Sequence, residues 1–127
     1  MGARINFVFK DSEPAIGEPA AWVVLYSHWG ADSWGYDIAN ALNHAAKRIA
    51  MDDHSYTTRM MISYLMSESI LDETGYGIFA VNADYNLYDE TVIIDLVNKT
   101  VNNVPFSEFI EQEFLAEQVR GRVTLSI

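Results

Sequence analysis

The stretch from Ala21 to Ala50 constrains the fold most strongly, because it predicts a strand, a loop and a helix in direct succession. Residues 22–25 are aromatic, β-branched or aliphatic, which is typical of a buried strand. Ser33 is then placed to cap a helix. The apolar positions of that helix share one stripe and are Trp34, Ile38, Ala41, Leu42, Ala45 and Ile49.

The rest of the chain predicts further strands and two more helices. The expected strands are Ile5–Phe9, Tyr76–Val81, Thr91–Val97, a short one at Val101 and a last one in residues 122–127. The second helix, Tyr56–Leu71 with Asp53 or Ser55 as its cap, is apolar on most sides, so we expect it to be buried or to face another protein. A third helix follows Pro105 and ends at Gly121, with Glu108, Glu111, Glu113 and Glu117 expected to face away from the core.

This order of elements predicts one α+β domain spanning residues 1–127. We expect an antiparallel or mixed sheet of about four to six strands, with two central helices and a C-terminal helix packed on it. The length is sufficient for a hydrophobic core, and the absence of cysteine excludes disulfides and thiolate metal sites. No apolar stretch is long enough to span a bilayer, and no secretory signal is recognisable, so a soluble protein is expected.

Acidic side chains dominate the charge. The formal net charge of -10 argues against direct binding to nucleic acid or to an anionic membrane. No Lys or Arg occurs from Met60 to Asn98, an interval that contains Glu68, Asp72, Glu73, Asp84, Asp89 and Glu90. The commoner interpretation is a solvated acidic surface, and the alternative is a face that meets a basic partner.

The loop at residues 26–33 lies between the strand expected at residues 22–25 and the helix that follows it. This loop contains several groups that could bind a ligand. The candidate binding residues are Tyr26, Ser27, His28, Trp29, Asp32 and Trp34. A helix N-terminus beside such groups can bind an anion or a small molecule, but the loop lacks the glycine spacing of a phosphate-binding motif. The competing and commoner interpretation is structural, with Trp29 and Trp34 covering the core and His28 bonding to the backbone.

No recognisable catalytic constellation occurs. The three histidines, His28, His44 and His54, lack metal-ligand spacing relative to one another. Ser27 and His28 are neighbours on a predicted strand, so their side chains should point to opposite faces. We therefore expect no metal, no cofactor and no enzymatic activity.

Five segments together carry a resemblance to a known group. INFVF, LYSHWG, SYTTRMMISYL, DETGYGI and TVIIDLVNKTV occur in this order between Ile5 and Val101. In this pattern, with LYSHWG as its most specific part, the chain resembles a group of small proteins encoded by actinobacterial phages, to which no enzymatic activity is assigned. The resemblance implies a small acidic phage protein that acts on host or phage components in the host cytoplasm.

The leading functional hypothesis is a non-enzymatic protein that binds a host or phage protein through an acidic and aromatic surface. One form of it is a DNA mimic that inhibits a defence or transcription protein. A virion-associated or self-assembling protein, and hence a homo-oligomer, is the second hypothesis. The third is a small-ligand or hydrolytic module that uses the His28 loop.

Overall fold

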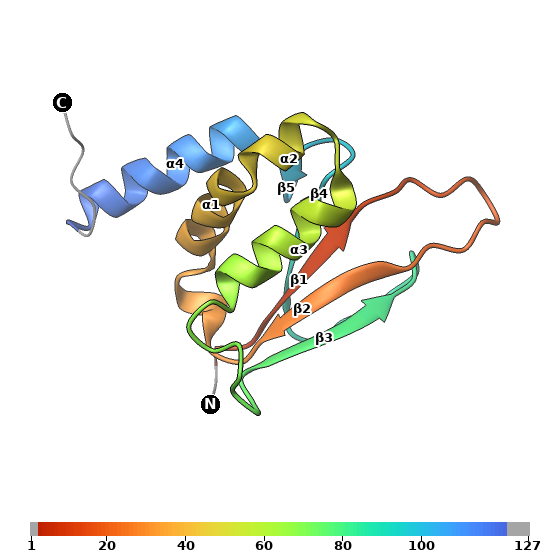
Figure 1. Ribbon diagram of the computed structural model, residues 1–127, viewed down its shortest axis with the longest axis horizontal. Helices are drawn as coiled ribbons and strands as arrows, with labels where there is room; N and C mark the ends of the chain where they lie inside the picture. Colours follow the sequence, from red (N-terminus) through yellow and green to blue (C-terminus); the bar gives the residue numbers. More distant parts are fainter. Residues whose placement is uncertain (1–2, 122–127) are drawn as a thin grey trace.

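The computed structural model describes residues 3–121, which form a six-stranded sheet and a layer of helices (Figure 1). The strands are β1 Ile5–Lys10, β2 Trp22–Ser27, β3 Tyr76–Val81, β4 Glu90–Asp95, β5 Thr100–Val101 and β6 Val104–Pro105. The helices are α1 Trp34–His44, α2 Ala46–Ala50, α3 His54–Leu65 and α4 Phe106–Val119, with a short 3-10 turn, η1, at Gly30–Asp32. The predicted α+β class is confirmed.

The sheet is mixed, with the order β3-β2-β1-β4-β5-β6. β1 and β4 run parallel in the centre, and every other neighbouring pair is antiparallel. A two-residue turn joins β5 to β6, and its residues Asn102 and Asn103 have φ angles of 47° and 70°. Two consecutive positive φ values define the type I′ turn that suits the twist of a hairpin, and asparagine tolerates them better than most residues.

The helices cover one face of the sheet, and the main core lies between the two layers (Figure 1). Ile5, Phe7 and Phe9 alternate onto this face, as the sequence predicted, and are at most 3% exposed. They meet the apolar stripe of α1, including Ile38 and Leu42. A smaller cluster on the opposite face consists of Val8, Trp22 and Val24 and is packed against Ala20, Val81, Tyr85 and Leu87.

Two predicted helices differ from the structure. The first is divided at Ala45 into α1 and α2, and the Ser33 side chain makes no capping bond to the backbone. Instead, the Ser33 hydroxyl donates to Asp37 Oδ2 at 2.8 Å. α3 is capped by Asp53, whose Oδ1 accepts from the Tyr56 N–H, but it ends at Leu65 because residues 66–71 form successive turns.

α3 is buried only in part, and the solvent exposure predicted for the glutamates of α4 is wrong in part. Among the residues of α3, Thr57 and Met61 are buried and the other apolar side chains are partly exposed, because α3 lies at the edge of the helical layer, with α1 on one side of it (Figure 1). On α4, Glu117 is buried rather than solvent-facing, and Glu113 is partly buried, because this side of the helix packs towards α1. The predicted strand in residues 122–127 lies outside the described residues.

Candidate functional site: an acidic cavity at one end of the sheet

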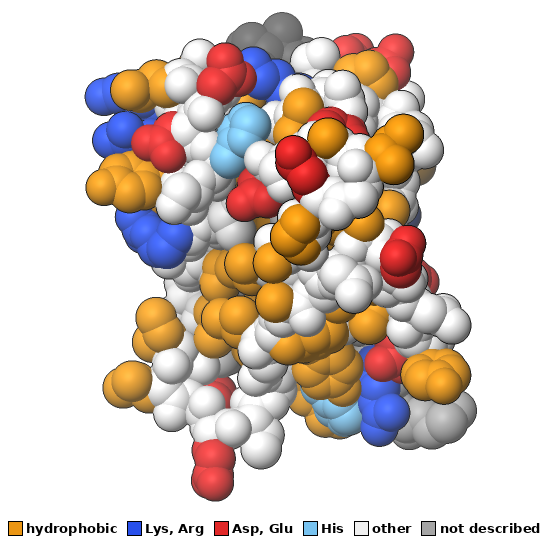
Figure 2. Space-filling view, turned by 90° about the vertical axis from the view of Figure 1, so that its right-hand side faces the viewer, with side chains coloured by type: hydrophobic (Ala, Val, Ile, Leu, Met, Phe, Trp, Pro, Cys, Tyr) orange, Lys and Arg blue, Asp and Glu red, His pale blue; other side chains and the backbone are white. Residues whose placement is uncertain are grey.

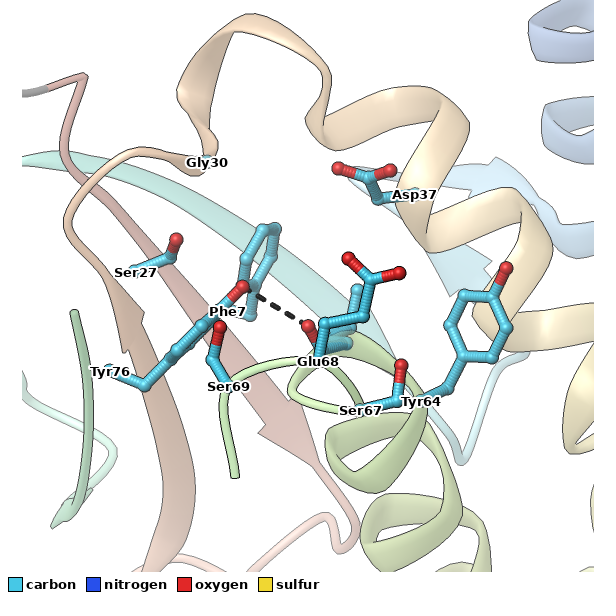
Figure 3. A pocket seen from close by; sticks show the side chains of 10 residues that line it. Phe7, Ser27, Gly30, Asp37, Tyr64, Ser67, Glu68, Ser69 and Tyr76 are labelled. Carbon is cyan, nitrogen blue, oxygen red and sulfur yellow. Dashed lines mark hydrogen bonds between the residues drawn. The ribbon is translucent and has the colours of Figure 1, made fainter. Parts of the chain in front are cut away.

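Two adjoining cavities lie where β2 ends and β3 begins. Their volumes are about 390 Å³ and 580 Å³. They share five lining residues, Ser27, Gly30, Asp37, Ser69 and Tyr76, and together form one acidic cavity, of which Figure 3 shows the smaller part. The Phe7 side chain forms an apolar part of the wall of the smaller cavity.

Segments far apart in the sequence build the acidic cavity. β2 delivers Ser27 to its rim, and the first turns of α1 deliver Asp37. The turns after α3 contribute the opposite wall, and they are held in place by Tyr76, whose hydroxyl donates to the Leu65 carbonyl at 3.1 Å (Figure 3). The His28 N–H donates to the Gly75 carbonyl at 2.9 Å and so continues the pairing of β2 with β3 to the rim.

Gly30 is needed where the chain leaves β2 for η1. A Cβ atom at this position would stand 2.6 Å from Ser27 Oγ and 3.1 Å from Ser27 Cβ. Glycine therefore permits the close approach that leaves Ser27 buried at the cavity wall.

The lining of the acidic cavity is anionic and rich in hydroxyls. Four carboxylates line it, those of Asp37, Glu68, Asp72 and Glu73. The hydroxyl side chains are Ser27, Ser33, Tyr64, Ser67, Ser69, Thr74 and Tyr76. No Lys or Arg is among the described residues that line either part. Such a site offers hydrogen-bond acceptors to a cationic group and repels anions.

The six residues of the predicted binding loop are distributed over three places. Ser27 and Trp29 line the acidic cavity. Tyr26 and His28 are bonded to one another, with the Tyr26 hydroxyl 2.7 Å from His28 Nδ1. Alternation along β2 separates Tyr26 from Ser27, so the loop is not one site.

Asp32 and Trp34 lie elsewhere, beside the start of α1. Both line a small cavity of about 150 Å³, together with Glu113, Glu117 and Arg120 of the α4 end. The Trp34 ring stacks on Phe109 with a centroid distance of 5.8 Å and an interplanar angle of 22°. Trp34 is thus part of the packing of α1 against α4.

The predicted acidic surface is also divided. Glu68, Asp72 and Glu73 line the acidic cavity, whereas Asp84, Asp89 and Glu90 do not. Sequence reasoning missed Asp37, Ser69 and Tyr76. Asp37 follows Ser33 by one helical turn, a polar pair that could have identified this side of the helix; Ser69 and Tyr76 carried no such pattern.

Exposed apolar side chains accompany the acidic cavity. Trp29 is 68% exposed and lines its larger part, while its ring meets that of His28 edge to face at 4.4 Å. Ile70 and Leu71, between the lining residues Ser69 and Asp72, are 63% and 95% exposed. Exposed aromatic side chains are enriched at the centres of protein interfaces, which polar groups surround as a rim.

Another cavity, of about 400 Å³, lies on the sheet face opposite the helices and contains Lys10, Trp22, Tyr85 and Asp95. Its polar groups already serve the fold. Asp95 Oδ1 accepts from the backbone N–H groups of Val97 and Asn98 at 3.0 and 2.9 Å. Burial alone would raise the pKa of Asp95, but these bonds, the Asn98 amide and the charge of Lys10 outweigh it and hold the pKa below its ordinary value.

Metal binding receives no geometric support in residues 3–121, where no three His, Asp or Glu side chains are grouped to hold an ion. Within the same residues, no helix has the length and apolarity needed to cross a membrane.

Comparisons with protein-family models, curated proteins and solved structures give no match to this chain.

Proposed function

We propose that this chain is a phage-encoded, non-enzymatic protein that binds a basic host or phage protein in the host cytoplasm. The observation that carries the proposal is the acidic cavity, which combines four carboxylates with hydroxyl groups and has no Lys or Arg among its described lining residues. The phage origin rests on the sequence resemblance described above.

The acidic cavity has the chemistry to receive a lysine or arginine side chain from the partner. A guanidinium or ammonium group donates several hydrogen bonds and accepts none, which matches carboxylate and hydroxyl oxygens. Asp37 approaches from α1, whereas Glu68 approaches from the turns after α3, so an inserted cation would meet acceptors from two sides (Figure 3).

The exposed apolar groups would supply the remaining contact. Trp29 and Leu71 stand next to the acidic lining in space or in sequence, and their burial against a partner would add a hydrophobic contribution to the electrostatic one. Where the basic groups of the partner also bind nucleic acid, this contact would compete with the nucleic acid, which is the basis of the DNA-mimic form of the hypothesis.

The experiment is an NMR titration of the full chain with tetra-arginine peptide. The test variant carries Glu68→Gln, Asp72→Asn and Glu73→Gln. The control variant carries Glu18→Gln, Asp84→Asn and Glu111→Gln, which removes the same number of charges from exposed positions that do not line the acidic cavity.

We expect amide shifts concentrated at Ser27, Ser69 and Gly75 in the native chain and in the control variant. Affinity should fall at least about tenfold in the test variant and should weaken as salt rises from about 50 to 200 mM. Equal affinity of the test and control variants, or shifts spread evenly over the acidic surface, would refute the assignment. The same pair of variants then tests a partner captured from host lysate and identified by mass spectrometry.

A further inference from the structure

Within residues 3–121, β3 forms one edge of the sheet. It stands first in the strand order, with β2 on one side and no described strand on the other. Its sequence, YGIFAV, has no charged residue and no proline, although edge strands are normally protected by such residues. Ile78 and Phe79 are 60% and 40% exposed.

The register shows which backbone groups of β3 point outward. Ser27 pairs with Tyr76, so His28 stands opposite Gly75, and the His28 N–H donates to the Gly75 carbonyl. Hydrogen-bonded pairs alternate along an antiparallel ladder, so Gly77, Phe79 and Val81 are directed to β2. Tyr76, Ile78 and Ala80 therefore present their N–H and C=O groups to the free edge.

The C-terminal end of β3 lies towards the right-hand side of the molecule in Figure 1. This side also exposes apolar side chains. Figure 2 shows this side, with hydrophobic side chains in a band across its middle and acidic side chains above and below. An added strand would cover Ile78 on the face of the sheet that carries the helices and Phe79 on the other, because adjacent residues of β3 alternate between faces.

One segment of the chain matches this edge in length and pattern. Residues 122–127, RVTLSI, lie outside the described residues and equal β3 in length. Val123, Leu125 and Ile127 alternate with Thr124 and Ser126, the pattern of a strand with one apolar face.

Charge also favours this segment. It begins with Arg122, two residues after Arg120, in a chain that has eight basic residues in total. β3 is flanked by Glu73 before it and by Asp84 after it, so a basic start meets an acidic group whether the strand is added parallel or antiparallel.

The described chain ends on the side of the molecule away from the C-terminal end of β3 (Figure 1). The segment follows α4, which contacts α1, β5 and β6, at the opposite edge of the sheet, and Figure 1 shows α4 running away from β3. α1 contacts both α4 and α3 and so separates them, and two interhelical spacings amount to about 16–20 Å. Six extended residues span at most about 20–22 Å, so few of them would remain to pair with β3 of the same copy.

We propose that residues 122–127 of one copy add as a strand to the free edge of β3 in a second copy. Because the two contact surfaces differ, the contact is heterologous, and it builds either a closed ring or an open chain of copies. This association does not rest on the proposed function, although Glu73 and Tyr76, at the start of β3, also line the acidic cavity.

The first experiment is sedimentation velocity of full-length variants over about 5–200 µM. Ile78→Lys places a charge on the edge and leaves the segment intact, whereas Leu125→Lys alters the segment and leaves the edge intact. Leu115→Lys, at a 49% exposed position of α4, is the matched control. Circular dichroism verifies that each variant is folded.

We expect the native chain and Leu115→Lys to associate, and each of the other two variants to sediment as a monomer. An equimolar mixture of Ile78→Lys and Leu125→Lys should form a one-to-one complex, because one supplies the segment and the other supplies the edge. A monomeric native chain, association of Leu125→Lys alone, or a mixture without a complex would each overturn the proposal; association of Leu125→Lys would point to β3 pairing with β3.

The second experiment uses the absence of cysteine from the chain. Ala80→Cys and Thr124→Cys variants are mixed under mild oxidation, with Glu111→Cys replacing Ala80→Cys as the control. We expect a disulfide between copies that carry residues 80 and 124 to form at least about tenfold faster than the control disulfide. Equal rates would overturn the proposed contact.

Discussion

The carboxylate of Glu113 on α4 lies directly against Gly35 in the first turn of α1. A Cβ atom at position 35 would stand 2.5 Å from the carboxylate carbon and both oxygens of Glu113. Glycine thus leaves the space in which this acidic group approaches the N-terminus of a helix, where backbone N–H groups favour negative charge. Burial is still the larger influence and raises the pKa of Glu113, with Arg120 opposing and Glu117 reinforcing the shift.

Gly35→Ala should displace the Glu113 side chain rather than the backbone, since the atoms in contact are the end of a flexible chain. The pKa of Glu113 should return towards its ordinary value, and the free energy of unfolding should change by less than about 1 kcal/mol. An NMR titration of the side-chain carboxyl groups measures the first effect. A Glu113 pKa that stays the same in the variant would show that Gly35 does not hold the carboxylate in place.

Glu113→Gln should be more stable than the native chain at neutral pH by up to about 1 kcal/mol. Because the folded state raises the pKa of Glu113, the stability that its neutral form supplies is complete below the ordinary pKa and is lost as pH rises through the folded value. The urea midpoints of the Glu113→Gln variant and of the native chain should therefore differ most at pH 7 and approach one another as the pH falls to 4. Glu111→Gln, at an exposed position, is the control, and a constant difference for Glu113→Gln across this range would contradict the prediction.

Asp95→Ala should lose about 1–3 kcal/mol at pH 7, because three donors lose their acceptor. These are the N–H groups of Val97 and Asn98 and the Asn98 side-chain amide. The folded state lowers the pKa of Asp95, so its stabilisation is present above the ordinary pKa and is lost as pH falls through the folded value. The loss measured by urea unfolding should shrink in acid, whereas Asp84→Ala, at an exposed position, should show little effect at any pH.

Asn102→Ala should cost about 1–2 kcal/mol, since it removes a hydrogen bond and places alanine at positive φ. Asn102 Oδ1 accepts from the Ile93 N–H at 2.8 Å, and the Asn102 N–H donates to the Ile93 carbonyl at 2.9 Å. Asn103→Gly, in the same turn, should leave stability unchanged or raise it slightly, because glycine adopts a φ of 70° without strain. Equal losses for both variants in thermal unfolding would contradict this explanation of the turn.

Much of the fold could be predicted because its signals are local. Alternation of Ile5, Phe7 and Phe9 identified the inner face of β1, and Pro105 and Gly121 bracketed α4. The errors occurred where packing outweighs local preference. The end of α3 at Leu65 is such a case, since the apolar residues beyond it resemble a helix in sequence but lie in turns whose position Tyr76 helps to hold.

The candidate site was less predictable, because it joins residues that the sequence does not relate. Ser27 and Glu68 were each noted, but in separate hypotheses, and they line one cavity. Tyr26 and His28, in contrast, were grouped with Ser27, although strand alternation separates them from it.

By itself, the sequence determined the α+β class, the inner face of β1, the apolar stripe of α1 and the acidic character of residues 60–98, because each depends on composition or on a short period along the chain. Tertiary structure alone decided the strand order, the free edge of β3, the burial of Glu117 and the meeting of Asp37 with Glu68 at one cavity. These features depend on contacts between residues distant in sequence, whose geometry follows from how the helical layer packs on the sheet.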